Sequence, residues 1–271
     1  NYDGTGNNVA LGYDSGHAMT TGINNTSVGS LSMGTGVTTG NNNVAIGYYS
    51  GVKLTSGSGN VVIGVEAGDA LTTGSNNIAI GYAALSTEDG NGNNIAIGKG
   101  SLQTLNAGAD AYNIAVGYNA GITMTTGVQN TIMGGLAGDA LTTGNYNIAI
   151  GHTALSTEDT GSKSIAIGHQ ALLNQNYNGD ALNTAIGHNV GAAITTGIQN
   201  VLIGGLAGDA LTTGSENVAI GYNALTAANG SEGRNVAVGF GTLAAQDGDG
   251  DAYNVAIGFE AGTTITAGVQ N

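Results

Sequence analysis

The sequence predicts an all-β protein, a parallel β-solenoid of about 15 coils with roughly 17 to 19 residues each. Three observations predict this fold. A five-residue motif, Asn-x-Ala-aliphatic-Gly, recurs along the whole chain, its copies follow at nearly constant intervals, and proline, which removes a hydrogen bond from a strand ladder, is absent. Coils of such a solenoid lie about 4.8 Å apart, so equivalent residues form columns.

The motif itself has the pattern of a strand. In the copy Asn77 to Gly81, alternation places Ile78 and Ile80 on one face and Ala79 on the other. We expect the Ile and Val column to form a thin core, and a second, weaker strand around Ala83 and Leu85. A helical hairpin repeat needs about 33 to 47 residues, so this repeat is too short for one.

The prediction of stacked coils depends mainly on two columns of equivalent residues, one of Asn and one of Gly. Inward Asn side chains, the first residue of the motif in fourteen copies and Ser164 in one, can form an amide ladder. Motif glycines supply a backbone position where a Cβ is costly. The ladder residues are Asn43, Asn60, Asn77, Asn94, Asn113, Asn130 and Asn147, and the glycines are Gly47, Gly64, Gly81, Gly98 and Gly117.

A longer period indicates duplication. The heptapeptide GDALTTG begins at Gly68, Gly138 and Gly208, at equal intervals. The chain therefore divides into successive four-coil blocks, 47–116, 117–186 and 187–257, within a single repeat domain, 1–271. Because it starts without an initiator Met and ends inside a motif, we interpret it as a fragment of a longer fibre.

Composition excludes several classes of function. Four Lys and Arg against 18 Asp and Glu give a net charge of −14, which argues against nucleic acid as a partner. No apolar run reaches the roughly 20 residues of a membrane helix, so we expect no membrane insertion in this segment. Nucleophile, zinc-protease and phosphate-loop motifs are absent. We predict no enzyme, no catalytic residue and no cofactor.

Acidic turns leave one alternative open. Asp247, Asp249 and Asp251 alternate with glycine, which fits a solvated turn or a weak calcium site. Glu88 and Glu158, each followed by Asp, are expected in surface turns. Pairs of threonines occur in two adjacent coils and then vanish for two, which favours turn chemistry over an ice-binding array.

Two further groups are candidates for contacts. The longest coils contain the longest turns, either tolerated insertions or a row of protruding contact loops with Tyr112, Tyr177 and Tyr253. Residues after the motif glycines are usually aromatic, but three successive coils have His152, His169 and His188. These histidines replace Tyr as stackable rings or form a transition-metal site or a pH-sensitive patch. They are weak metal candidates, and we predict no metal.

With fifteen copies between Asn8 and Gly258, the motif resembles the YadA-like head (Hep/Hag-type) repeats of trimeric autotransporter adhesins and of related bacteriophage tail fibres. The resemblance implies a left-handed β-roll, three chains around one axis, and an extracellular fibre. It also suggests that the small Ala79 faces the other two chains. The coils here are longer than those of the usual head repeat.

We therefore expect a structural and adhesive segment of a trimeric fibre on a virion or bacterial cell surface. A phage tail-fibre-type host-attachment protein is favoured by the longer coil. The alternatives are the head of a bacterial trimeric autotransporter adhesin and an independent ice- or glycan-binding solenoid. The predicted partners are two further copies of the chain, in a homotrimer, and a host or cell-surface receptor that the sequence does not identify.

Overall fold

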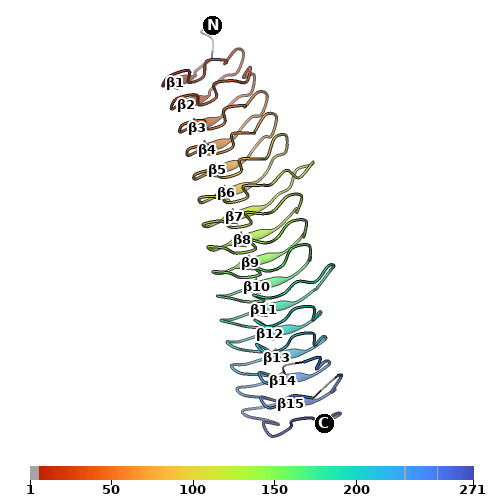
Figure 1. Ribbon diagram of the computed structural model, residues 1–271. Coiled ribbons are helices and arrows are strands. Elements are labelled where there is room, and N and C mark those ends of the chain that lie inside the picture. Colours follow the sequence, from red (N-terminus) through yellow and green to blue (C-terminus); the bar gives the residue numbers. More distant parts are fainter. Residues whose placement is uncertain (1–5, 229, 249) are drawn as a thin grey trace. The chain divides into compact units, whose positions relative to one another are not determined.

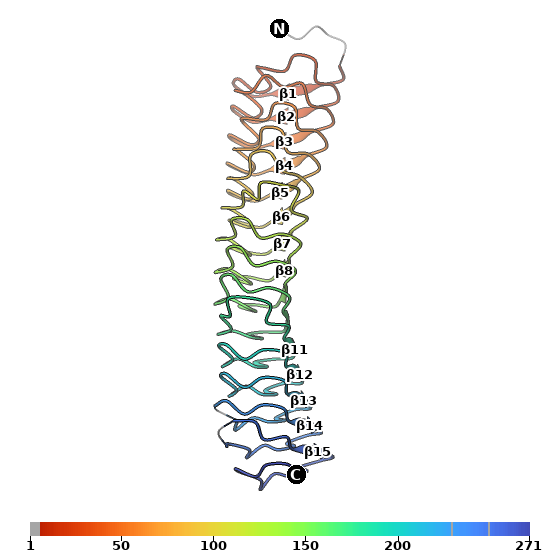
Figure 2. The same cartoon turned by 90° about the vertical axis from the view of Figure 1, so that its right-hand side faces the viewer.

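The computed structural model describes residues 6–228, 230–248 and 250–271. Across these residues the protein is all-β, with fifteen parallel strands of three residues, one in each coil and in chain order. The chain forms two compact units, Asn1–Ile132 and Met133–Asn271. Within each unit the coils stack so that the strands lie above one another on one side (Figures 1 and 2).

The strands coincide with the three central residues of the motif. The first unit contains β1 (Val9–Leu11), β2 (Thr26–Val28), β3 (Val44–Ile46), β4 (Val61–Ile63), β5 (Ile78–Ile80), β6 (Ile95–Ile97) and β7 (Ile114–Val116), and β8 (Thr131–Met133) ends just past its boundary. The second unit contains β9 (Ile148–Ile150), β10 (Ile165–Ile167), β11 (Thr184–Ile186), β12 (Val201–Ile203), β13 (Val218–Ile220), β14 (Val236–Val238) and β15 (Val255–Ile257). Equivalent residues pair, as Ala79 does with Ala96, so motif positions form columns.

The expected second strand of each coil is absent from the described residues. After β5, the backbone has positive φ at Gly81 (133°), Ala83 (51°) and Leu85 (51°). Strands need strongly negative φ, so this alternation turns the chain repeatedly instead of extending it. The turns bond to the next coil, as Leu85 N does to Ser101 O at 3.0 Å.

The faces of the strands are the reverse of the predicted ones. Ala79 is fully buried inside the coil, whereas Ile78 and Ile80 are only half-buried. The expectations of an Ile and Val core, and of Ala facing other chains, were therefore wrong. The narrow interior also holds the Asn side chain and residues from the turns, so only a small side chain fits beside them.

The Asn side chains form a buried ladder inside the coils. Asn60 donates from Nδ2 to Asn43 Oδ1 (3.1 Å) and to Gly74 O (2.9 Å), and its own Oδ1 accepts the backbone N–H of Asn77 (2.9 Å). Each side chain thus joins three coils and satisfies backbone groups that no strand partner reaches. In the second unit Asn200 makes the equivalent bonds to Asn183 and Gly214.

Two further columns fill the rest of the interior, and their residues divide the coils into two types. In some coils the fourth residue after the motif glycine is glycine and the seventh is large, as with Gly68 and fully buried Leu71. In others the fourth residue is leucine, as with buried Leu85, and the seventh is Glu88. Two coils of the first type alternate with two of the second, which explains the four-coil block. Coils of the second type have Glu88, Leu105, Glu158, Gln175, Ala228 and Gln246 at the seventh position.

Candidate functional site

Half-exposed aliphatic side chains form the outer face of the sheet. Ile46, Ile114 and Ile186 keep 37–38% of their surface exposed. We call this surface the aliphatic face, and none of its members is charged. Its members, all aliphatic except Thr184, are Val44, Ile46, Val61, Ile63, Ile78, Ile80, Ile95, Ile97, Ile114 and Val116 in the first unit, and Ile148, Ile150, Ile165, Ile167, Thr184, Ile186, Val201, Ile203, Val218, Ile220, Val236 and Val238 in the second. Exposed apolar surface of this continuity is typical of interaction sites.

A second surface feature is the ring column, the residues that follow the motif glycines. Tyr222 stacks on Phe240 with centroids 5.6 Å apart, and Phe240 stacks on Phe259 at 5.3 Å. In the first unit a cation takes the place of a ring. Lys99 Nζ lies 5.9 Å from the ring centroid of Tyr82 and 5.7 Å from that of Tyr118, one coil to either side.

His152, His169 and His188 belong to this ring column. Their centroids are 5.7 and 5.1 Å apart and their planes differ by 9° and 11°. Two nitrogens on one zinc ion lie at most about 4.2 Å apart, and parallel rings at this spacing do not converge on one ion. The geometry therefore favours the stacking interpretation over a metal site within one chain.

The three tyrosines of the long turns do not form one row. Tyr112 and Tyr253 are exposed and occupy the same position, directly before the Asn of the motif, with φ of 53° and 54°. Leu182 holds that position in the long coil of the four-coil block between them. Tyr177 lies elsewhere in its turn and is half-buried, with its N–H 3.3 Å from Glu158 Oε2. Of these three tyrosines, only Tyr112 and Tyr253 present equivalent rings to solvent.

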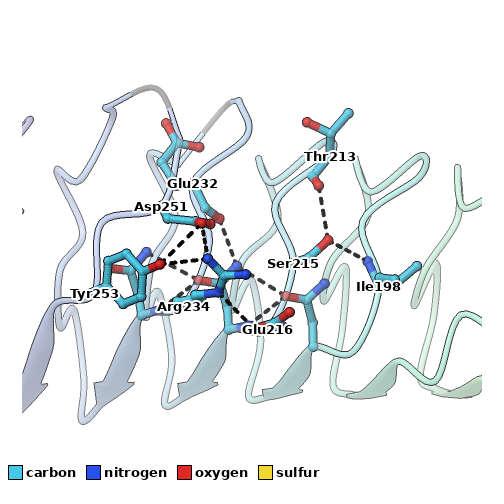
Figure 3. Close-up of polar contacts among 11 residues, drawn as sticks. Ile198, Thr213, Ser215, Glu216, Glu232, Arg234, Asp251 and Tyr253 are labelled. Carbon is cyan, nitrogen blue, oxygen red and sulfur yellow. Dashed lines mark hydrogen bonds and ion pairs between the residues drawn. The ribbon is translucent and has the colours of Figure 1, made fainter.

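Charged residues pair across neighbouring coils next to these turns. Arg234 donates from Nε to Glu216 (2.9 Å) and from NH1 to Tyr253 OH (2.7 Å), and it forms an ion pair with Asp251 (Figure 3). The hydrogen bonds to Glu216 and Tyr253 and the charge of Asp251 hold the pKa of Arg234 above its ordinary value. Asp251, which the calcium hypothesis treated as a metal ligand, is therefore paired with the guanidinium of Arg234. Asp249 lies outside the described residues.

Lys163 and Asp180 make the equivalent pair one block earlier, at 2.5 Å. In the first unit Asn93 stands at the place of the cation, and Asp110 accepts the N–H of Gly92 at 2.9 Å. Among the described residues no group of three His, Cys, Asp or Glu side chains is placed to hold a metal ion.

Glu88 and Glu158 were expected in surface turns, and this expectation was wrong, because both are fully buried. They stand at the seventh position of their coils, among leucines. Glu158 accepts hydrogen bonds from Gly161 N (2.8 Å), Gln175 Nε2 (2.9 Å) and Tyr177 N (3.3 Å). Burial still raises the pKa of Glu158, because its hydrogen bonds offset only part of the desolvation.

Ser164, the one break in the Asn column, is explained by the same network. Gln175 Nε2 donates to Ser164 Oγ (2.8 Å), and its Oε1 accepts from Asn183 Nδ2 (2.8 Å). The Gln carboxamide therefore takes the room of the missing Asn side chain. One block later Asn235 is present, and Gln246 Nε2 is buried without a hydrogen-bond partner among the described residues.

Exchanging this pair is expected to show strong coupling. Ser164→Asn alone crowds Gln175, and Gln175→Leu alone removes a hydrogen-bond partner from Ser164 and Glu158, so each costs about 1–3 kcal/mol. The double variant recreates the Asn94 and Leu105 pair of the preceding block and should recover most of that loss. Free energies of unfolding from urea titrations test this. Additive losses would contradict the network.

Stability should also depend on pH through Glu158. Its pKa is raised in the folded state, so its contribution is fully present below the unfolded pKa and is lost as pH rises through the folded one. Burial raises the pKa values of Asp69, Asp139 and Asp209 as well. The free energy of unfolding of the native chain should therefore fall as the pH rises from acidic values. Glu158→Gln should give a shallower decline between pH 4 and pH 7 in melting experiments. Parallel curves for the two proteins would rule out this role.

In the part of the chain that the structure describes, no helix is long and apolar enough to span a membrane. No family model, curated protein or solved structure matches the chain.

Proposed function

We propose that the protein is a non-enzymatic, structural and adhesive segment of an extracellular trimeric fibre, of the phage tail-fibre type that attaches to a host. The motif's resemblance to YadA-like head repeats supports this proposal, including the left-handed coil. The β-solenoid of stacked coils, shared by both units, is the architecture such a fibre needs.

The aliphatic face is the observation that carries the proposal. Its half-exposed Ile and Val side chains form two uncharged columns on a sheet that nothing in the described chain covers. A second copy presents the same columns at the same spacing of about 4.8 Å, so the copies match in parallel register. Burial of Ile, rather than the close approach of Ala, would then hold the trimer together.

Charge opposes this assembly and limits how it forms. Three chains total 3 × −14 = −42, and the repulsion falls as salt screens it. Since the aliphatic face itself is uncharged, association buries no carboxylate there. The edges of the sheet, with the ring column and Tyr112 and Tyr253, would stay available for adhesion.

Sedimentation equilibrium at physiological salt tests the proposal. We expect three times the mass of one chain for the native protein. Ile80→Lys combined with Ile97→Lys places two charges on the aliphatic face and should give monomers. The matched control, Thr87→Lys, adds charge at an exposed turn position and should stay trimeric. A stable native monomer, or trimers of the double Lys variant, would refute the proposal.

A further inference from the structure

Between its first ring, His152, and its last, Phe259, the ring column of the second unit is interrupted at one coil. Between His188 and Tyr222 the position is held by Gly205, and both flanking rings are exposed. Rings elsewhere in this unit stack at 5.1–5.7 Å on the ring of the next coil. We call the space beside Gly205 the ring gap. The rings of the column are those of His152, His169, His188, Tyr222, Phe240 and Phe259.

The backbone at Gly205 does not require glycine. A Cβ there would lie 3.4 Å from Tyr222 Cδ2 and 3.9 Å from His188 O, which are tolerable contacts. The preceding Gly204 differs, because its φ is +128° and a Cβ would lie 2.5 Å from Gly221 O. Val65 holds the equivalent position two blocks earlier. The missing side chain is therefore a feature of the surface and not a demand of the fold.

The size of the ring gap suits one flat or slender group. His188 and Tyr222 belong to coils two steps apart in the stack, and two coil spacings amount to about 9.6 Å. The first unit shows what such a position accepts, because Lys99 extends between the rings of Tyr82 and Tyr118 one coil to either side. Arginine also pairs with a ring on this protein, since Arg234 lies 5.4 Å from the ring centroid of Tyr253 (Figure 3).

We propose that the ring gap at Gly205 binds a lysine or arginine side chain of a basic partner protein. The net charge of −14 attracts a cationic partner and gives no such advantage to a neutral ring. The ring faces add cation–π attraction. The chain's own basic residues already have partners elsewhere. Lys53 interacts electrostatically with Asp69, Lys99 lies beside two tyrosine rings, and Lys163 and Arg234 form ion pairs with carboxylates. This site is formed by one chain and does not depend on the trimer.

Titration of the native protein with a hexa-arginine peptide tests the proposal. NMR should show the largest shifts at the ring protons of His188 and Tyr222. Gly205→Tyr closes the ring gap without changing charge and should weaken binding roughly tenfold, within the range of a desolvated cation–π contact. Val65→Tyr is the matched control and should bind like the native chain. If Gly205→Tyr misfolds, Gly205→Val can replace it in the experiment, because Val65 already occupies the equivalent position of another block.

A second variant tests the proposal through a gain of peptide binding. Lys99→Gly opens an equivalent gap between Tyr82 and Tyr118, so the peptide should now shift both of these rings. Equal affinity for the native chain and the Gly205 variants would overturn the proposal, as would shifts spread evenly over exposed tyrosines. Tighter binding of N-acetyl-tyrosinamide than of N-acetyl-argininamide would overturn it too, because a ring and not a cation would then be the occupant.

Discussion

Gly81→Ala is expected to destabilise the protein by about 4 kcal/mol or more, among the largest effects of any single substitution. Gly81 has φ of +133°, a conformation that residues with a Cβ rarely adopt. The added Cβ would also lie 2.6 Å from the carbonyl carbon and oxygen of Gly98. Because this neighbour is backbone in the next coil, relief requires the stack itself to separate. Urea unfolding of the variant measures the loss.

Gly135→Ala is the control for that experiment. The φ of Gly135 lies outside the left-handed region, and the nearest atom to an added Cβ is His152 Cδ2 at 3.6 Å. We expect a change within about 0.5 kcal/mol. Similar losses for the two variants would contradict the explanation, because glycine itself, and not the close approach of the coils, would then be responsible.

Asn60→Ala is expected to cost about 3–5 kcal/mol, because two buried backbone groups lose their bond to this side chain and a third buried group loses one of its two donors. Gly74 O and Asn77 N each lose the hydrogen bond they make with the Asn60 side chain, and Asn43 Oδ1 loses a donor. The effect exceeds the loss of one ordinary hydrogen bond, since water does not reach the interior of the coil. Thermal or urea unfolding measures it.

Asn106→Ala provides the comparison. Asn106 is exposed, and its backbone N–H, which the substitution keeps, bonds Thr125 O at 2.8 Å. Its stability should stay within about 0.5 kcal/mol of the native value. A loss at Asn60 no greater than that at Asn106 would show that the ladder contributes little to stability.

The repeat made the stacking predictable. A motif that returns at nearly constant intervals places equivalent residues in columns. A column of Asn then predicts an amide ladder, and a column of Gly predicts a close approach of the backbone between coils. The strand boundaries follow in the same way, because Asn77 and Gly81 enclose the three residues of β5. The structure places the Asn side chains inside and the motif glycines at close approaches between coils.

The pattern could not decide which face of the strand is inside. Alternation of Ile78, Ala79 and Ile80 defines two faces but does not say how much room each one has. Hydrophobicity favoured Ile for the core, but the size of the coil's interior favours Ala. The Asn residue of the motif held the missing signal, because Asn77 and Ala79 are two residues apart and so share a face.

The buried carboxylates were missed for a related reason. Glu88 reads as part of an acidic turn when only its neighbours in sequence are considered. Reading the seventh residue after each motif glycine shows it in a column with Leu71 and Leu105, both buried. This column was present in the sequence and would have predicted the interior position of Glu88.

Hydrogen exchange of the Asn side-chain amides tests the central claim most directly. In NMR spectra of the native protein, the Nδ2 protons of Asn43, Asn60 and Asn200 should exchange slowly, because each donates to a neighbouring side chain or carbonyl inside the coil. Those of exposed Asn106 should exchange at the rate of a free amide. Equally fast exchange at all four residues would contradict an interior Asn ladder and with it the inward orientation of the motif.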